Sequence, residues 1–416
     1  MKRSPLLRVV VVGAGVVGTL ILQRLRDLSD DVEIICIEKG AKSYEAGTGL
    51  NIAPNAIKTL SKFLPALAAA LQQPDVSLPW LSWTAGLTDG TVIMDLPLSQ
   101  VASHPGIRIR WSMLYRQLRT GLDPWIRYNT IATEMGYDFA HPNRPLYLVT
   151  QNQLTGESER FDQIDLILAC DGRYSQVRQT FFGGTPQPDH LGVCIYRVLV
   201  PNRADQLIGD YQQWFHAGTR LLTFAIPGQA VYIAGSLPLG SDQVIPDEAK
   251  TARFLQQRYQ SPRGYSEVCQ FLVDSICDNL DQVHWARVQE IPTVFNDAGG
   301  HVLCLGDSAH AMFPTLAQGA TQAFEDGCLA GDRLLHAVIE AQERQTALNI
   351  PQLTAQIAHE RQARIEFVKQ FSREASDSLL AGSEPIAELK AKTQPAFLRQ
   401  LTQLYQDVPA PLPEVL

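Results

Sequence analysis

The sequence predicts an α/β protein, in which a parallel sheet covered by helices receives an inserted antiparallel sheet and is followed by C-terminal helices. Three observations support this fold class. The chain begins with a strand, helix and strand pattern, short runs with partial alternation fill residues 192–239, and helical periodicity returns after residue 318. A chain of 416 residues is long enough for two or three packed units.

The composition excludes several classes of protein. Lysine and arginine number 35 against 43 aspartates and glutamates, so the formal net charge is −8, and nucleic-acid binding is not expected. An apolar fraction of 45% excludes a disordered chain, and no uninterrupted apolar run is long enough for a membrane span. Seven scattered cysteines without a CxxC pair predict reduced thiols in a cytoplasmic protein and no metal site.

The first unit begins with a βαβ segment. Leu6–Val12 is a valine-rich apolar run, Gly15–Leu28 carries apolar residues at helical spacing, and Val32–Glu38 is again strand-like. Gln163–Cys170 and His301–Leu305 predict two further buried strands, each of which stops at an Asp-Gly or Gly-Asp pair. These strands would extend the same parallel sheet.

The rest of the chain has different patterns. The apolar runs between Gly192 and Leu239 are divided by turn residues, which predicts the antiparallel sheet of a second unit. Gln318–Glu343 and Ile357–Leu380 predict helices, and the tail beyond Pro385 predicts one further short helix with a proline-rich end.

The βαβ segment carries a dinucleotide-binding fingerprint. Gly13, Gly15 and Gly18 form GxGxxG between strand and helix, where they permit a tight turn, the approach of a pyrophosphate and close packing of the helix. Glu38 ends the second strand, where a carboxylate accepts hydrogen bonds from an adenosine ribose and would repel a 2′-phosphate. NAD or FAD therefore fits better than NADP, and Lys39 is a neighbouring candidate contact. The alternative is a glycine turn without ligand and a solvated glutamate.

Three later segments complete a family pattern. Residues 47–60 form a glycine-rich turn that leads into a helix, residues 165–178 contain Asp-Gly, and residues 302–326 contain Gly-Asp followed by a loop and a helix start. With the fingerprint, and in this order, they resemble the group A FAD-dependent aromatic hydroxylases. These single-component flavoprotein monooxygenases include salicylate and 6-hydroxynicotinate hydroxylases. The resemblance runs from residue 7 to about residue 375.

The resemblance implies a domain organisation and a set of ligands. Residues 1–75, 105–182 and 298–345 would form a discontinuous, Rossmann-like FAD-binding domain. Residues 76–104 and 183–297 would form the substrate domain, and residues 346–416 the C-terminal helices. FAD would be the bound cofactor and NADH or NADPH the co-substrate. O2 and a small aromatic substrate complete the set, and the protein would be a monomer or homodimer.

The resemblance also assigns cofactor contacts. Gly49 lies in the glycine-rich turn, and Asp171 would hold both FAD and the passing nicotinamide, although an Asp-Gly pair is also a common turn. Asp307 would accept a hydrogen bond from a ribityl hydroxyl, with a helix cap as the alternative. The backbone N–H groups of Gly319 and Ala320 would stabilise negative charge on the reduced flavin.

Two parts of the pattern depart from the family. Arg110 resembles the arginine that contacts FAD just before a helix, but the usual spacing of that motif places Trp111 at the position. Arg108 is the second candidate, and a surface arginine is the alternative. Ala317 and Thr321 stand where the family more often has glycine and asparagine, so the loop is expected to be stiffer.

Arg197 and Tyr196 are the catalytic candidates. They lie in an otherwise apolar strand, where a charged side chain is costly unless it is paired, and the segment resembles the family's YR strand. Arg197 would hold a phenolate next to the flavin. Because side chains alternate along a strand, Arg197 could instead face away and Tyr196 would then face the pocket. His310 is expected to be structural rather than a base.

The implied activity is hydroxylation of a small aromatic or phenolic substrate with NAD(P)H and O2, through a C4a-hydroperoxyflavin in a closed apolar pocket. Three alternatives remain open. The first is a flavin-dependent epoxidase or Baeyer–Villiger-type enzyme, and the second is a non-catalytic flavin- or ligand-binding protein. The third is a membrane-associated hydroxylase of lipid-soluble quinone precursors.

Overall fold

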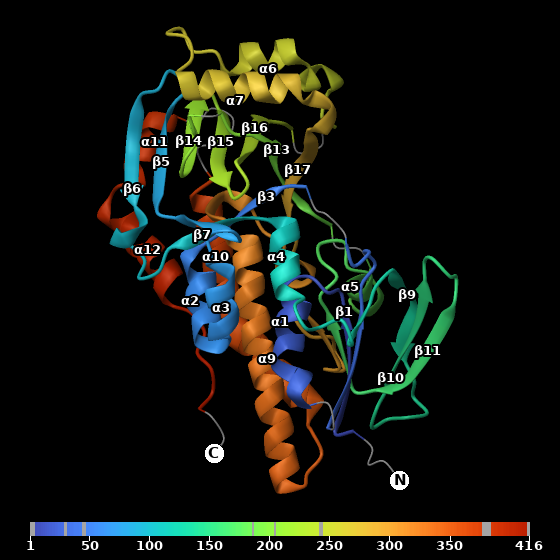
Figure 1. Ribbon diagram of the computed structural model, residues 1–416. Coiled ribbons are helices and arrows are strands. Elements are labelled where there is room, and N and C mark those ends of the chain that lie inside the picture. Colours follow the sequence, from blue (N-terminus) through green and yellow to red (C-terminus); the bar gives the residue numbers. More distant parts are fainter. Residues whose placement is uncertain are drawn as a thin grey trace.

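A computed structural model describes residues 5–28, 31–43, 47–184, 187–203, 205–240, 244–376 and 384–413. A parallel sheet with long helices forms one part of the molecule, and a large antiparallel sheet covered by two helices forms the other (Figure 1). The expected fold class is confirmed.

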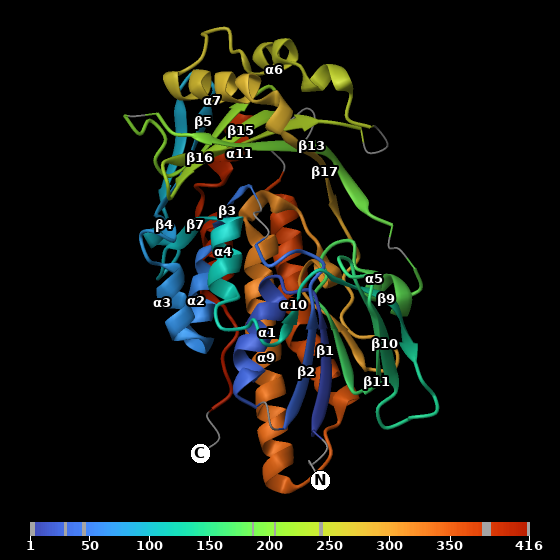
Figure 2. The ribbon, with the colours of Figure 1, turned by 45° about the vertical axis from the view of Figure 1, so that its right-hand side comes forward.

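A five-stranded parallel sheet is the centre of the first part. Its strand order is β18-β12-β1-β2-β8, and its central strands are continuous apolar runs because both faces are covered. Helices α1 and α9 cover one side, and a small antiparallel sheet lies on the other (Figure 2). The strands are β1 (Leu7–Val12), β2 (Val32–Ile37), β8 (Ile126–Arg127), β12 (Leu166–Ala169) and β18 (Val302–Cys304).

The small antiparallel sheet was not predicted from the sequence. Its order is β11-β10-β9, with β9 (Thr130–Tyr137), β10 (Leu146–Asn152) and β11 (Ser158–Ile164). The single strand predicted over Gln163–Cys170 is wrong in one respect, because β11 ends at Ile164 and β12 begins at Leu166. Gln163 has a φ of 55°, and the carboxylate of Asp165 accepts a hydrogen bond from the Arg8 N–H at 2.7 Å. These features turn the chain from one sheet into the other.

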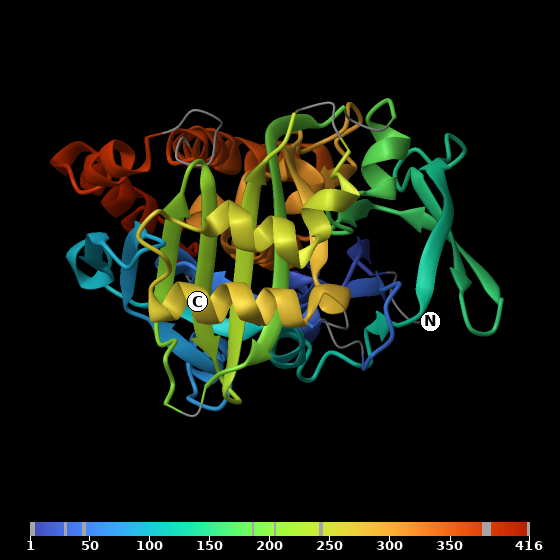
Figure 3. The same cartoon turned by 90° about the horizontal axis from the view of Figure 1, so that it is seen from above.

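A seven-stranded sheet forms the second part, in the order β17-β13-β16-β15-β14-β5-β6. It is antiparallel except where β14 pairs with β5. Helices α6 (Ala252–Tyr259) and α7 (Glu267–Asp278) lie across one face (Figure 3). The strands are β5 (Ser82–Leu87), β6 (Val92–Pro97), β13 (Asp189–Pro201), β14 (Tyr211–His216), β15 (Thr219–Ile226), β16 (Ala230–Pro238) and β17 (His284–Glu290).

A three-stranded sheet in the order β3-β7-β4 lies between the two parts (Figure 2). It consists of β3 (Gly49–Ile52), β4 (Ser77–Trp80) and β7 (Gly106–Arg110). The helices outside the seven-stranded sheet are α1 (Val16–Leu25), α2 (Pro54–Phe63), α3 (Pro65–Leu71), α4 (Trp111–Leu118), α5 (Gln176–Phe181), α8 (Asp307–His310), α9 (Gln318–Arg344), α10 (Ile350–Glu374), α11 (Pro385–Ala391) and α12 (Pro395–Gln406).

The C-terminal helices differ from the sequence prediction. Helix α10 begins at Ile350, before the predicted Ile357, because the Asn349 side chain accepts a hydrogen bond from the Gln352 N–H at 3.2 Å and caps the helix. The predicted end at Leu380 lies outside the described residues. The tail forms two helices, α11 and α12, where one was predicted. Within the described ranges, no helix has both the length and the apolar character needed to cross a bilayer.

Candidate active site

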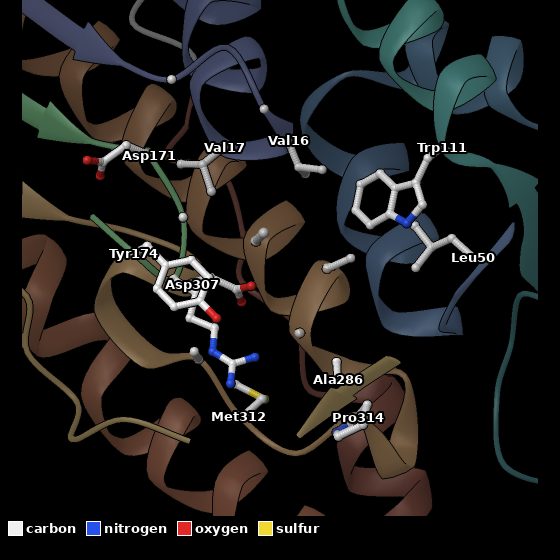
Figure 4. A pocket seen from close by; sticks show the side chains of 18 of the residues that line it. Val16, Val17, Leu50, Trp111, Asp171, Tyr174, Ala286, Asp307, Met312 and Pro314 are labelled. Carbon is white, nitrogen blue, oxygen red and sulfur yellow. The ribbon is translucent and has the colours of Figure 1, made fainter. Parts of the chain in front are cut away.

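A pocket of about 760 Å³ lies between the parallel sheet and the seven-stranded sheet. Its lining includes residues that lie just beyond the carboxyl ends of four strands of the parallel sheet. These residues are Gly13 after β1, Glu38 after β2, Asp171 after β12 and Asp307 after β18. The carboxyl ends of parallel strands are where α/β folds bind their ligands. Figure 4 shows Asp171 and Asp307 on one side of the pocket and Trp111 and Leu50 on the other.

The glycines of the fingerprint have different surroundings. Gly13 has a φ of 102°, and a Cβ there would lie 2.4 Å from the Cys170 carbonyl oxygen. A Cβ on Gly18 would lie 2.1 Å from the Gly13 carbonyl oxygen, so the helix could not approach the turn. By contrast, a Cβ on Gly15 would meet no atom within 4 Å. Gly15 therefore borders open space at the start of α1, where a phosphate would find backbone N–H groups.

Glu38 is held by the backbone and by an arginine. Its carboxylate accepts hydrogen bonds from the N–H groups of Ala14 at 2.9 Å and Gly40 at 2.7 Å. The guanidinium of Arg119 lies 3.5 Å from the same carboxylate and donates to the Ala14 carbonyl at 2.9 Å. Arg119 was not predicted, because no local pattern links it to the fingerprint. Lys39 also lines the pocket.

Asp171 has one carboxylate oxygen in use and one without a partner. Its Oδ2 accepts a hydrogen bond from the Gln176 N–H at 2.8 Å. Its Oδ1 is buried and has no hydrogen-bond partner among the described residues. Burial raises the pKa of this carboxyl, whereas hydrogen bonds from Ser175 and from the backbone N–H groups of Gln176 and Val177 act to lower it. A buried oxygen without a partner is costly unless a ligand satisfies it.

Asp307 points into the pocket from the end of β18 (Figure 4). Its carboxylate accepts no hydrogen bond from the described residues, so a capping role is not seen. Desolvation inside the pocket raises the pKa of this carboxyl, whereas the positive charges of His310 and Arg173 act to lower it. His310 itself is buried, and its Nε2 lies 2.7 Å from the Asp326 carboxylate, as a structural histidine would.

The first turn of α9 faces the same pocket. Gly319 and Ala320 both line it. Ala317 stands before the helix in the left-handed conformation, with a φ of 56°. The Thr321 hydroxyl donates to the Ala317 carbonyl at 2.7 Å and accepts from the Ala53 N–H at 3.0 Å. The two departures from the family pattern therefore work together to fix this loop.

Arg110, predicted to contact the cofactor, and its alternative Arg108 are not among the residues that line the pocket. Arg110 precedes α4 and does not line the pocket, whereas the next residue, Trp111, does. Arg108, the second candidate, is buried and donates to the carbonyls of Pro79 at 2.9 Å and Ala225 at 3.1 Å. Neither arginine reaches the pocket.

The two catalytic candidates lie on opposite faces of the seven-stranded sheet. The Tyr196 hydroxyl donates to the Tyr259 hydroxyl of α6 at 2.7 Å, and the Tyr196 ring lies 4.5 Å from that of Trp285. A Cβ on Gly235 would collide with this ring, so the glycine makes room for it. The Tyr196 side chain therefore belongs to the core beneath α6 and α7, although the residue itself is among those that line the pocket. Alternation along β13 turns the Arg197 side chain to the pocket face.

Arg197 lies beside Tyr232 on the pocket face. The Arg197 Nε is buried without a hydrogen-bond partner among the described residues. Burial raises the pKa of the Tyr232 phenol, whereas Arg197 and Arg220 both act to lower it. A Cβ on Gly49 would lie 2.9 Å from the Tyr232 Cβ, so Gly49 allows β3 to pack on this tyrosine. Arg220 was missed in the sequence, although it is a charged residue in an apolar strand, which was the signal used for Arg197.

The described residues contain no group of three or more histidine, cysteine or acidic side chains that could hold a metal ion. No family model matches the chain. It is 27% identical to the FAD-dependent monooxygenase OpS4 of Beauveria bassiana over 389 residues, which cover 88% of this chain and 83% of the relative. It is 23% identical to 6-hydroxynicotinate 3-monooxygenase of Pseudomonas fluorescens over 346 residues, which cover 79% of this chain and 82% of the relative.

The chain is therefore similar to FAD-dependent monooxygenases over most of its length. A solved structure shares its fold, the Klebsiella pneumoniae protein HpxO complexed with FAD and uric acid. The two structures have a TM-score of 0.77 and 17% identity, with 97% of each chain covered. The pocket of this chain fits a flavin dinucleotide in three respects: the open space at Gly15, the unpartnered oxygen of Asp171 and the free carboxylate of Asp307.

Proposed function

We propose that the protein hydroxylates a small aromatic or phenolic substrate, with NAD(P)H as electron donor and O2 as oxygen source. One observation carries this proposal: a single pocket joins a dinucleotide-binding end to the face of the seven-stranded sheet that carries Arg197. Such a pocket would bring a substrate on the sheet next to a cofactor on the parallel-sheet side. Bound FAD would supply the electron transfer and oxygen activation expected from the family.

The residues of the cofactor end have distinct proposed roles. Glu38 would accept hydrogen bonds from the adenosine ribose, and the N–H groups near Gly15 would receive the pyrophosphate. Asp307 would accept a hydrogen bond from a ribityl hydroxyl. Gly319 and Ala320, at the start of a 27-residue helix, would direct N–H groups and the positive end of the helix dipole to the flavin ring.

At the substrate end, the proposed role of Arg197 is to hold the phenolic oxygen. A guanidinium favours the deprotonated hydroxyl, and the resulting ring is more nucleophilic. Apolar side chains such as Leu222, Phe224 and Ala234 line the same face. They would keep water away from the reacting atoms, so that oxygen is transferred to the ring and peroxide is not released.

The proposal is tested by substrate-stimulated turnover of the FAD-loaded protein. NADH and NADPH oxidation, hydrogen peroxide release and hydroxylated product are measured together over a panel of phenols and hydroxylated N-heterocycles. At least one compound should accelerate oxidation and appear as a product with one added oxygen. An epoxide or a ring-expanded ester as product would favour the epoxidase or Baeyer–Villiger alternative, and no acceleration with any compound would contradict the proposal.

The role of Arg197 has its own test. Arg197→Met should lower product formation and raise the fraction of electrons that end in peroxide, while FAD binding stays intact. Arg263→Met is the matched control, because the Arg263 side chain is 80% exposed on the same part of the chain. If Arg197→Met converts the same fraction of oxidised NAD(P)H into product as the wild type and only unfolds at a lower temperature, Arg197 has a structural role and the proposed role is wrong.

A cytoplasmic location is part of the same proposal. All seven cysteines are free thiols in the structure, and those in buried strands, such as Cys36 and Cys304, have a pKa raised by burial. Reduced, unreactive thiols suit a reducing compartment.

A further inference from the structure

Arg220 is a buried guanidinium on the pocket face of the seven-stranded sheet. It lies in β15 and is only 6% exposed. Its neighbour Leu221 belongs to the cluster under α6 and α7, so alternation turns Arg220 to the opposite face, toward the pocket. Ser236, which pairs with Arg220 across the sheet, has a buried hydroxyl without a hydrogen-bond partner among the described residues.

Arg220 also lacks the partners that other buried arginines of this chain have. Arg361 is paired with the carboxylate of Asp326, and Arg178 donates to the Ser308 carbonyl at 2.9 Å. Within the described part of the chain, the Arg220 side chain makes no ion pair and no hydrogen bond. Burial lowers the pKa of this guanidinium, and nearby tyrosine hydroxyls oppose the effect only in part. An unpaired buried cation is costly, so its retention calls for an anion.

The charges around the pocket are segregated. Among the described lining residues, the carboxylates are Glu38, Asp171 and Asp307, and all three follow strands of the parallel sheet. The strands of the seven-stranded sheet contribute no carboxylate to the described lining, but they contribute Arg197, Arg220 and Arg287. The end of the pocket opposite the cofactor groups is therefore cationic, and no carboxylate of the described lining residues lies at that end.

We infer that Arg220 is a specificity-determining residue that binds an anionic group of the substrate, a carboxylate or a comparably acidic substituent. This inference rests on the proposed function in one respect, since it takes the sheet side of the pocket as the substrate site. A planar guanidinium binds a carboxylate through two parallel hydrogen bonds, and in a water-poor pocket such a pair orients the ring that carries it. Arg197, on β13 and separated from β15 by β16, remains available for the phenolic oxygen.

The test compares acids with their amides by calorimetric titration of the FAD-loaded protein. The pairs are 2-hydroxybenzoate and 2-hydroxybenzamide, 4-hydroxybenzoate and 4-hydroxybenzamide, and 6-hydroxynicotinate and 6-hydroxynicotinamide. At least one acid should bind about tenfold or more tightly than its amide, the scale of a hydrogen bond to a charged group. Arg220→Gln should abolish this preference, whereas the exposed control Arg263→Gln should keep it.

A second variant separates recognition from folding. Arg220→Met should unfold at the same temperature as the wild type or above it, because it removes an unpaired buried charge and keeps an apolar side chain in its place. A marked fall in its melting temperature would make Arg220 a structural residue and overturn the inference. It is also overturned if no acid binds more tightly than its amide, or if Arg220→Gln keeps the preference.

The outcomes also separate this inference from the proposed function. If only the amides stimulate NAD(P)H oxidation and product formation, the hydroxylase function stands and the anion subsite fails. If acids bind through Arg220 but no compound is hydroxylated, the anion subsite stands and the proposed function fails.

Discussion

Glu38 serves both the fold and the proposed ligand. Its two oxygens accept hydrogen bonds from the N–H groups of Ala14 and Gly40. Arg119 balances its charge and lies over the ring of Tyr115, 4.9 Å from its centre. The carboxylate is therefore already oriented in the absence of ligand, which would lower the entropic cost of binding the proposed ribose.

Glu38→Ala is expected to weaken FAD binding by about 1–3 kcal/mol, the scale of a lost charge-assisted hydrogen bond. Titration of the apoprotein with FAD measures the loss. FMN, which lacks the adenosine, serves as the control ligand, and its affinity should change much less. Equal FAD affinity in the variant and the wild type would remove Glu38 from the site.

Asp307→Ala should leave folding nearly unchanged and impair the flavin site. The carboxylate accepts no hydrogen bond from the described residues, and desolvation raises its pKa, so the fold gains little from its charge. The melting temperature of the apoprotein should stay close to that of the wild type, while FAD affinity falls or peroxide release rises. A fully flavinated variant with normal coupling would show that the residue is dispensable.

At the scale of elements, local patterns predicted the parallel sheet well. Three of its strands, β1, β2 and β18, are short apolar runs that end at glycine or acidic residues. The apolar run and the residues that end it are neighbours in the sequence, so a short window is enough to predict the strand. The β9–β11 sheet was missed because its strands are amphipathic and partly exposed, with charged residues such as Glu134 and Arg160. Their pairing depends on contacts between strands, and the local sequence pattern of one strand does not show these contacts.

The site was predicted in part for the same reason. Gly13, Gly15 and Gly18 form a contiguous motif with a fixed geometric meaning, so their place could be predicted. Arg119 and Arg220 come from other elements, and only the folded chain brings Arg119 to Glu38 and Arg220 to the pocket. Tyr196 and Arg197 could not be told apart either, because the face that each occupies depends on where α6 and α7 pack.

Helices α9 and α10 are joined by a buried charge network that also holds the Gly306-Asp307 turn. Arg361 donates to Asp326 at 2.6 Å and to Glu325 at 3.0 Å. The second oxygen of Asp326 accepts from the Gly306 N–H at 2.6 Å. Through this carboxylate, α10 supports the backbone that presents Asp307 to the pocket.

Arg361→Met should lower the free energy of unfolding by about 3–5 kcal/mol, because it leaves two buried carboxylates without their shared partner. Chemical denaturation of the apoprotein measures the loss. Arg344→Met is the control, since that side chain is 70% exposed on α9, and surface substitutions usually change stability by less than about 0.5 kcal/mol. Equal effects of the two substitutions would contradict the role of the network.

The same network predicts acid sensitivity. Burial alone would raise the pKa values of Glu325 and Asp326, but Arg364 and Arg361 lower that of Glu325, and His310 and Arg361 lower that of Asp326. Carboxyls with a depressed folded pKa stabilise the fold fully above their ordinary values of 4.5 and 3.8, and this contribution is lost as the pH falls further.

Unfolding measured from pH 7 downward should therefore show a loss of stability that begins near pH 4.5. Asp165 and Asp171, whose pKa values are raised mainly by burial, act in the opposite sense over the same range. The comparison with Arg361→Met isolates the network, because that variant should lose less stability on acidification. An identical pH dependence in both proteins would contradict the assignment.

At the scale of the whole molecule, the pocket is built from both main parts of the chain. Its lining combines Gly15 and Asp307 of the parallel-sheet part with Arg197 and Tyr232 of the seven-stranded sheet. A ligand that fills it contacts both parts at once, so ligand binding should stabilise the native arrangement as a unit. This coupling makes thermal unfolding a direct measure of occupancy.

FAD should raise the free energy of unfolding by about 2.7 kcal/mol at a concentration of 100 Kd, and by about 1.4 kcal/mol more for each further tenfold increase. The melting temperature of the apoprotein should therefore rise steadily with the logarithm of FAD concentration. Riboflavin, which lacks the phosphates and the adenosine, should give a much smaller rise at the same concentrations, because it cannot use the backbone N–H groups at Gly15 or the carboxylate of Glu38. Equal stabilisation by riboflavin and FAD would mean that the fingerprint contributes nothing to binding and that the flavin ring alone selects the pocket.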